Sequence, residues 1–274
     1  MGFLKSLFGG KDETPEEKKA REAERNFDML KTDGVRALRT GRHDIAVKCL
    51  TKALEIQDEL ETHDYLSQAY MQAENFSAAL EQLAILAEAQ PDNIRILATM
   101  AKVAYMTEDY TKMRAFCEKA MLIDKDDPEV MFLYARAAAG HNDMVNAIAM
   151  YTKTIMLDGD FAAAYLERGQ LLLRMGDIDG ADDDANYLLE VAPGAEDVTL
   201  LKANVLMRRN QYADAIKFFD QTIEAHPYST EAYKGRGAAR LALGDKEGAE
   251  SDMRQVLDID PHALDGVSGD FTLS

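Results

Sequence analysis

The residue types that most often carry chemistry are scattered along this chain. Its five histidines never occur at the three- or four-residue spacing that places two metal ligands on one helical face. The two densest carboxylate runs, at residues 182–184 and 124–127, lack the glycine and distal glutamate of a calcium-binding loop, and we interpret them as solvated charge. The sequences GxGxxG, GxxxxGK(S/T) and GxSxG are absent. We therefore predict that the chain is not an enzyme and holds no cofactor or metal.

Composition narrows the classes of partner. The 274 residues are 47% hydrophobic and 29% charged, as expected for a folded protein with a solvated surface. The net charge of -18 repels nucleic acid and anionic lipid, which carry the same sign. Cys49 and Cys117 lie in apolar stretches without CxxC spacing, so we interpret them as buried thiols of a reducing compartment. Without an apolar run of roughly 18 residues or a signal peptide, we expect a cytoplasmic protein.

The elements that would position any site follow from a repeat. Pro193, Pro227 and Pro261 are 34 residues apart, and each ends an apolar helical stretch. A 34-residue frame laid back from Pro261 gives seven blocks, the first shifted by one residue. The blocks begin at Phe27, Leu60, Ile94, Pro128, Ala162, Glu196 and Thr230. Position one is the first residue of each block.

Independent positions support this frame. The eighth position is always small: Gly34, Ser67, Ala101, Ala135, Gly169, Ala203 and Gly237. The twentieth is alanine in every block except the third: Ala46, Ala79, Met113, Ala147, Ala181, Ala215 and Ala249. Small residues at two such points let two helices cross closely. Near position fifteen, Gly41, Asn142, Gly176, Asn210 and Gly244 are residues that end helices in the left-handed conformation. Each block is therefore predicted to be a helix-turn-helix.

This combination of a 34-residue period, a small eighth residue, an alanine at position twenty and a closing Asp-Pro resembles the tetratricopeptide repeat family. The clearest unit runs from Ala232 to Pro261. The resemblance implies an all-α fold, an α-α superhelix or solenoid of about seven helix-turn-helix repeats over residues 27–263. Position four lacks the family's tryptophan, three closing prolines are missing, and Met113 replaces alanine in the third unit. We expect the packing of that unit to differ.

The resemblance also implies a function and a site. The first helices of such repeats line a concave groove that binds peptides or helices of partners, so we predict a non-catalytic interaction scaffold or adaptor. Residues at positions five, nine, twelve and thirteen would face the groove, where polar side chains stand beside apolar sockets. The predicted groove residues are Gln68, Lys102, Tyr105, Phe132, Arg136, Leu166, Gln170, Arg174, Asn204, Met207 and Arg208.

Several cations fall in this row of an otherwise acidic protein. We hypothesise that Lys102, Arg136, Arg174 and Arg208 grip an acidic segment or a C-terminal carboxylate of another protein. The alternative is that they are solubility charges or pair with acidic residues of neighbouring repeats. The family's chaperone-binding carboxylate clamp is not matched, because Lys31 is followed by Val35 at position nine.

The two ends allow other interpretations. Residues 14–26 are predicted to be a charged helical extension, solvated or acting as a partner-binding arm, that starts at a Thr14-Pro15-Glu17 capping box. Residues 1–13 are a flexible segment whose short amphipathic stretch is a frayed tail, a membrane or partner anchor, or a myristoylation signal. The stretch places Phe3, Leu4, Leu7 and Phe8 on one face. Residues 264–274 are predicted to be a flexible tail without a capping helix, which leaves an end that a homodimer or the tail would cover.

Two alternative functions follow from these features. The first is a membrane-associated assembly factor anchored by the N-terminal amphipathic segment, in which case the protein is cytoplasmic but membrane-associated. The second is a regulator whose groove senses a peptide and changes superhelical pitch. Partner identity is not encoded in the repeat itself, since one scaffold serves unrelated tasks.

Overall fold

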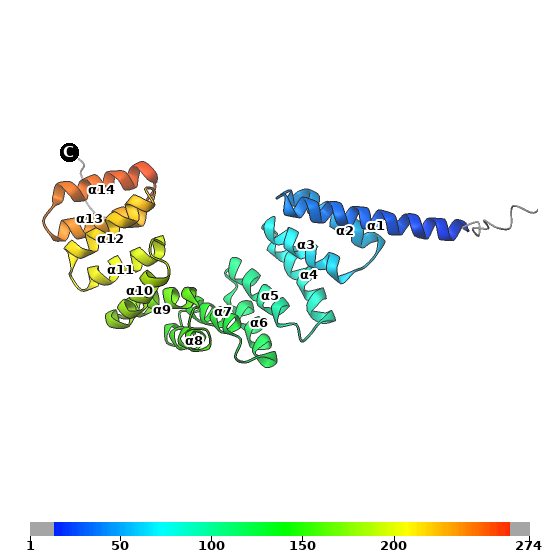
Figure 1. Ribbon diagram of the computed structural model, residues 1–274, viewed down its shortest axis with the longest axis horizontal. Coiled ribbons are helices and arrows are strands. Elements are labelled where there is room, and N and C mark those ends of the chain that lie inside the picture. Colours follow the sequence, from blue (N-terminus) through cyan, green and yellow to red (C-terminus); the bar gives the residue numbers. More distant parts are fainter. Residues whose placement is uncertain (1–13, 264–274) are drawn as a thin grey trace, which may run out of the picture. The chain divides into compact units, whose positions relative to one another are not determined.

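The computed structural model describes residues 14–263, and this part of the chain is entirely helical, with no strand (Figure 1). The expectations for Phe3, Leu4, Leu7, Phe8 and residues 264–274 lie outside it. The helices are α1 Pro15–Arg39, α2 His43–Ile56, α3 Leu60–Gln72, α4 Phe76–Ala89, α5 Ile94–Met106, α6 Tyr110–Ile123, α7 Pro128–Gly140, α8 Met144–Leu157, α9 Ala162–Met175, α10 Ile178–Val191, α11 Glu196–Arg208, α12 Tyr212–Ala225, α13 Thr230–Ala242 and α14 Lys246–Ile259.

The helix boundaries follow the 34-residue frame. From the second repeat onward, every block begins at the first residue of a helix, as with α3 at Leu60 and α13 at Thr230. The second helix of each repeat begins at position seventeen. The predicted all-α array of seven helix-turn-helix repeats is therefore confirmed.

Helix α1 is longer than the other helices. Thr14 starts it with a capping box, in which Thr14 Oγ1 accepts a hydrogen bond from the Glu17 backbone N–H at 3.2 Å and the Thr14 N–H donates to Glu17 Oε2 at 2.8 Å. The helix then continues without a break into the first repeat and ends at Arg39. The charged stretch and the first repeat helix are thus one element.

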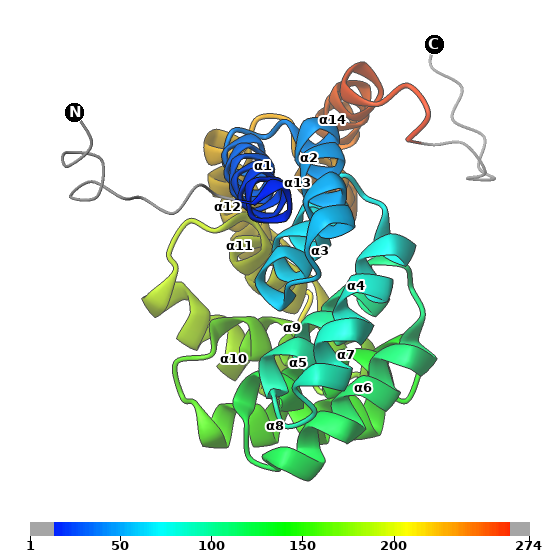
Figure 2. The ribbon, with the colours of Figure 1, turned by 90° about the vertical axis from the view of Figure 1, so that its right-hand side faces the viewer.

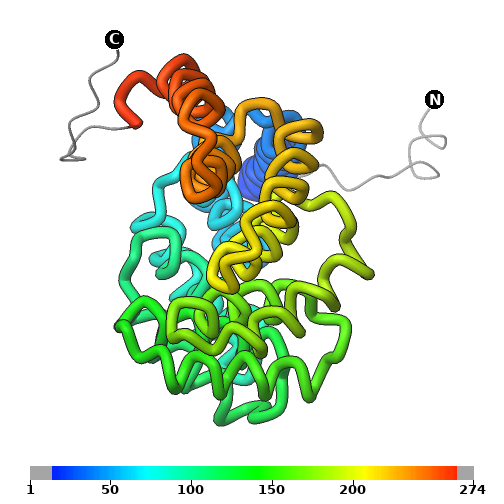
Figure 3. Tube along the Cα trace, turned by 90° about the vertical axis from the view of Figure 1, so that its left-hand side faces the viewer, coloured from blue at the N-terminus to red at the C-terminus, as the bar shows by residue number. Residues whose placement is uncertain are grey.

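The chain divides into two compact units, residues 1–125 and residues 126–274. The first contains the repeats of α1 to α6, and Figure 2 shows α1 and α2 running side by side as one of its hairpins. The second contains the repeats of α7 to α14. Its last two repeats, α11 to α14, follow each other as consecutive hairpins in the tube of Figure 3.

The two helices of a repeat approach closely at positions eight and twenty. A Cβ added to Gly34 would lie 2.7 Å from Leu50 Cγ of α2, and a Cβ added to Gly169 would lie 3.2 Å from Asp184 Cβ of α10. The alanines at position twenty in repeats one, two, four, five and six are fully buried. Met113 is buried equally well, so the third repeat accommodates the larger side chain within its hairpin.

The turns inside the repeats adopt the left-handed conformation. Gly41, Asn142, Gly176, Asn210 and Gly244 all have positive φ, as the sequence predicts. The second and third repeats use glutamate at this point instead, with φ of 56° at Glu74 and 54° at Glu108. A side chain with a Cβ is strained there, because the Cβ crowds the following carbonyl oxygen.

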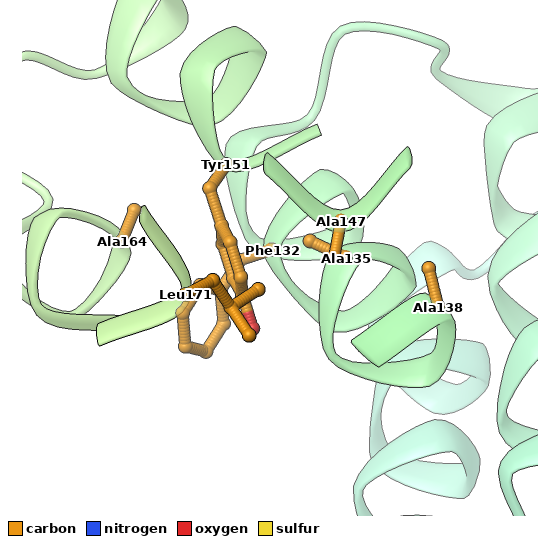
Figure 4. Close-up of a cluster of buried hydrophobic side chains, with 7 residues drawn as sticks. All are labelled: Phe132, Ala135, Ala138, Ala147, Tyr151, Ala164 and Leu171. Atoms are coloured by element: carbon orange, nitrogen blue, oxygen red, sulfur yellow. The ribbon is translucent and has the colours of Figure 1, made fainter. Parts of the chain in front are cut away.

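Large side chains fill the space that the alanines leave. In the second unit, Phe132 of α7 and Tyr151 of α8 pack with their ring centroids 5.6 Å apart, and Leu171 of α9 lies against them (Figure 4). Tyr151 is completely buried, and its hydroxyl donates to Glu167 at 3.3 Å. One repeat is thereby joined to the next through apolar contacts that include a satisfied polar tip.

A half-buried arginine also links consecutive repeats of the second unit. Arg168 of α9 donates from Nε and Nη2 to the Asp184 carboxylate of α10 at 3.0 and 2.6 Å, and from Nη1 to Thr152 Oγ1 of α8 at 3.0 Å. The Asp184 side chain is only 2% exposed, and this burial raises its pKa against the opposing effect of Arg168. One guanidinium therefore holds the second helices of two successive repeats.

The same arrangement recurs two repeats later. Arg236 of α13 bonds the buried Asp252 of α14 from Nη2 at 2.5 Å and Asp220 of α12 from Nη1 at 2.6 Å. In the intervening repeat, Lys202 occupies the corresponding position seven and donates to Asn186 of α10 at 2.7 Å. In the last three repeats, position seven is thus a polar link to the preceding repeat.

The interpretation of residues 182–184 as solvated charge was wrong for two of the three aspartates. Asp184 is buried against Arg168, while Asp182 is largely buried and accepts bonds from Lys202 and, at 2.6 Å, from Arg209 Nη1. Only Asp183 is exposed. Consecutive helical residues point about 100° apart, so three adjacent carboxylates meet three different environments.

Enlarging a position-twenty alanine should disrupt a hairpin. Ala181→Leu forces extra volume into the contact between α9 and α10, so we expect it to lower the free energy of unfolding by about 1–3 kcal/mol. The matched control is Ala213→Leu on α12, where the alanine is exposed. Urea unfolding followed by circular dichroism measures both. Equal stability of the two variants would contradict the close approach.

Relieving the strained turn of the third repeat should stabilise it. Glu108→Gly removes the Cβ at a φ of 54°, so we expect the melting temperature to rise by roughly 1–4 °C. Glu81→Gly is the control, because Glu81 lies within α4, where glycine destabilises a helix. Differential scanning calorimetry reads both changes. A lower melting temperature for Glu108→Gly would show that the glutamate is not strained.

The ion pairs of Asp182 should make stability depend on acid. Burial opposes ionisation of this carboxyl, but the hydrogen bonds from Lys202 and Arg209 outweigh that effect and lower its pKa below the ordinary 3.8. A lowered folded-state pKa adds stability above pH 3.8 that is lost as the pH falls through the folded value. In Lys202→Met, we expect a smaller loss of urea midpoint between pH 5 and 3 than in the unaltered protein. Lys217→Met, whose partner Asp214 is exposed, should keep the original pH dependence.

Candidate functional site

The eleven predicted groove residues divide between the two units, and each set stands by itself. In the first unit, Gln68 of α3 is half-buried, and its Nε2 donates to Asp64 at 3.0 Å. Lys102 of α5 is exposed, and Tyr105 of the same helix packs edge-on against Tyr110 with centroids 6.3 Å apart. These side chains are partly engaged by their own neighbours.

Two predicted residues of the second unit are occupied within the fold. Phe132 is only 9% exposed and belongs to the hydrophobic core, so it offers a partner little surface and is not an open socket. Arg136 lies over the Phe132 ring at 5.4 Å from its centroid and forms an ion pair with Glu167 of the next repeat at 3.1 Å. For Arg136, the alternative of pairing with a neighbouring repeat therefore holds.

The apolar residues of the predicted row serve mainly to join repeats. Leu166 of α9 is half-buried and packs against the core cluster that contains Leu188 and Leu201. Met207 of α11 packs similarly against the cluster around Phe219. Each keeps part of its surface accessible, which would form an apolar floor beside polar groups.

Two neighbouring helices each present an amide side chain and an arginine. Gln170 and Arg174 lie one turn apart on α9, and Asn204 and Arg208 lie one turn apart on α11. Gln170 and both arginines are exposed, and Asn204 is half-buried. Within residues 14–263, none of the four forms a hydrogen bond or ion pair. Helices α9 and α11 contact each other. An amide and a guanidinium are therefore repeated side by side.

Arg174 and Arg208 lack an acidic partner within the described residues, whereas the other cations of α9 and α11 have one. Arg168 and Lys202, on the same two helices, are held by Asp184 and by Asp182. Amides donate and accept hydrogen bonds, and guanidinium groups bind carboxylates through paired hydrogen bonds. The four side chains thus suit a peptide segment that carries carboxylates.

The first unit contains grooves that the sequence did not locate. One, of about 880 Å³, lies on α1 and α3 and is lined by Thr32, Val35, Arg39 and Tyr65 among others. A second, of about 380 Å³, lies on α3 to α5 and includes Asp64, Arg95 and Ile96. The repeat frame places these residues on first helices, but groove volume depends on side-chain packing that no spacing reveals.

Lys31 at the edge of the larger groove is neutralised. Its Nζ lies 2.7 Å from Glu59 and 2.5 Å from Glu61. Burial opposes the charge of Lys31, but the hydrogen bonds to both glutamates outweigh this effect and raise its pKa. The hydrogen bond from Lys31 is in turn the main cause that lowers the pKa of Glu59 and of Glu61. A lysine held by two carboxylates is poorly placed to bind a third, which supports the mismatch to the carboxylate clamp.

The described part of the chain shows no grouping of side chains suited to metal binding. Among residues 14–263, no three His, Cys, Asp or Glu side chains gather into a group that would bind a metal ion. Both cysteines have free thiols, and burial raises the pKa of Cys117 to about 12, so this thiol stays protonated. The described helices include none with the length and apolar character needed to cross a membrane.

Comparison with known proteins gives consistent matches. The model of the tetratricopeptide repeat family matches residues 166–230 and 200–263. DnaJ homolog subfamily C member 3 of Mus musculus is 31% identical over 151 residues, which cover 48% of this chain and 30% of that protein. The chain spans only about a third or less of the length of the curated relatives that it matches.

Solved structures share the fold. A tetratricopeptide repeat protein from Parabacteroides merdae superposes with a TM-score of 0.71 at 16% identity, covering 86% of this chain and 94% of that one. YrrB, described as a tetratricopeptide repeat protein with an unusual peptide-binding site, gives 0.55 at 14% identity, covering 66% and 94%. Arrays of this kind are typically non-catalytic scaffolds for protein–protein interaction. The repeat frame, the helical hairpins and these matches show that the chain is built of tetratricopeptide repeats, and the family model itself matches residues 166–263.

Proposed function

We propose that this chain is an interaction scaffold that holds a carboxylate-rich or carboxylate-ending segment of another protein against α9 and α11. The observation that carries the proposal is the repeated pair of Gln170 with Arg174 and Asn204 with Arg208. All four lack a polar partner within residues 14–263, although acidic side chains hold the other cations of these two helices.

Geometry favours an extended peptide. The two pairs belong to consecutive repeats on helices that contact each other, so one segment crossing both would meet an amide and a guanidinium at each step. The amides would bind its backbone, the arginines its carboxylates, and Met207 its apolar side chains. Arg136 is left out of this set because Glu167 already holds it.

Charge would make this recognition selective. The chain as a whole repels acidic partners, so an acidic segment binds only where unpaired cations concentrate. An exposed ion pair contributes about 0.2–1 kcal/mol, and two arginines acting together would add to the affinity of the segment. Because these groups are exposed, the attraction weakens as salt is added.

The proposal predicts the effect of reversing both charges. We expect fluorescein-labelled decapeptides rich in Asp and Glu to bind the full chain, and Arg174→Glu/Arg208→Glu to weaken this binding at least tenfold in fluorescence anisotropy. Peptides with free and with amidated C-termini separate recognition of a terminal carboxylate from recognition of side chains. Circular dichroism checks that the variant remains helical.

The matched control is Lys217→Glu/Arg254→Glu, which makes the same charge change at exposed positions of α12 and α14. It should bind the acidic peptides as the unaltered protein does. Equal weakening in both double variants would mean that only net charge matters, and unchanged binding in the Arg174/Arg208 variant would refute the proposed site.

A further inference from the structure

Most second helices carry a charged residue at one outward-facing position, and α8 departs most strongly from this pattern. Position twenty-nine of five repeats is an exposed carboxylate: Glu55, Glu88, Glu190, Glu224 and Asp258. In the other two repeats, the residue is Leu122 of α6 or Met156 of α8, with 88% and 82% of its surface exposed. A single exposed apolar residue is normal on a protein surface, whereas a contiguous apolar surface marks an interaction site.

Helix α8 continues this departure along its length. Val145 is 69% exposed, and Ala149 is also exposed. Residues 145, 149 and 156 are spaced by whole turns of a helix, so they form one stripe about 16 Å long. The opposite side of α8 buries Ala147, Tyr151 and Thr154 in the core. Helix α8 is therefore apolar on both sides, and one side faces solvent.

Helix α10 carries the opposite chemistry at the same repeat positions. Asp179, Asp183 and Glu190 are the equivalents of Val145, Ala149 and Met156, and all three are exposed. Asp179 is bound by Arg209 at 2.6 Å. Asp183 and Glu190 form no ion pair within the described range, so their charges are available.

Helices α8 and α10 are linked through side chains of the fold. The guanidinium of Arg168 bonds Thr152 of α8 and Asp184 of α10 at once, which fixes these helices within reach of a single side chain. Tyr187 of α10 also donates to the Gly159 carbonyl, just after α8, at 2.9 Å. Thr152 lies between Ala149 and Met156 along α8, whereas on α10 the bonded Asp184 is buried and Asp183 beside it is exposed.

We propose that the outer surface of α8 and α10 docks an amphipathic helix of a partner protein, with its apolar face on Val145, Ala149 and Met156 and its basic residues toward Asp183 and Glu190. Ala149 leaves room for a close approach between helices, and the flexible Met156 adapts to the side chains that it meets. Complementary charge fixes the orientation of the partner.

The same features disfavour the other occupants. A second copy of this chain would bring like charges together, since each copy carries -18. A stable dimer also needs roughly 800 Å² from each partner, more than a stripe of three side chains provides. An anionic membrane would be repelled by the acidic row of α10. This surface is on second helices and does not depend on the proposed site on the first helices α9 and α11.

The test uses designed helical peptides and the full chain. The probe is an 18-residue labelled peptide with leucines spaced by four, three and four residues and lysines along one flank. Its controls are the same peptide with glutamates in place of the lysines and a scrambled sequence. By fluorescence anisotropy, we expect the basic peptide to bind at least tenfold more tightly than either control.

Variants of the chain locate the binding. Val145→Glu/Met156→Glu should weaken binding of the basic peptide at least tenfold. Asp183→Lys/Glu190→Lys should weaken it too and should gain affinity for the glutamate peptide, an exchange that a misfolded variant would not show. Leu122→Glu, at the equivalent position of α6, and Arg174→Glu/Arg208→Glu should leave binding unchanged.

Three results would overturn the proposal. The first is equal binding of the lysine and glutamate peptides, which would show that charge is not read. The second is a loss in Leu122→Glu as large as that in the stripe variant, which would indicate non-specific hydrophobic contact. The third is a dimer in analytical ultracentrifugation that Val145→Glu/Met156→Glu converts to monomer while no peptide binds, which would make a second copy the occupant.

Discussion

The close approach of two helices at positions eight and twenty is the constraint on which the rest of this structure depends. An added Cβ would crowd Leu50 at Gly34 and Asp184 at Gly169, so these neighbours would have to shift. That approach sets the register of each hairpin, and the register determines which side chains meet elsewhere. Arg168 reaches Asp184, and Arg236 reaches Asp252, because the same separation recurs in both hairpins.

Much of the fold was predictable because the constraint is local and periodic. Small residues, turn residues and closing prolines recur every 34 residues, so helix beginnings such as Leu60 and Ala162 followed from counting. The turn at Glu108 was not predictable in this way, because glutamate rarely adopts positive φ. Tertiary packing imposes the conformation there, and no side-chain preference indicates it.

The candidate site was predictable in its position but not in its state. The frame places Arg136, Arg174 and Arg208 on first helices, yet only the structure shows that Glu167 holds Arg136 and that no described residue holds the other two. Likewise, Asp182, Asp183 and Asp184 read as one acidic run although they occupy three environments. Successive side chains of a helix point about 100° apart, so each meets different neighbours. Which neighbours these are depends on contacts between repeats.

The arginines that hold buried aspartates have a consequence for how this array unfolds. In a simple repeat protein, each hairpin has its own stability, and neighbours add a separate interface term. Arg168 and Arg236 blur that division, because one guanidinium completes its own hairpin and satisfies a side chain of the preceding one. Opening either repeat alone would strand a buried aspartate without its counter-charge, a costly intermediate. Fraying from the last helices should therefore proceed in coupled steps, and the second unit should exchange its amide hydrogens more cooperatively than the first.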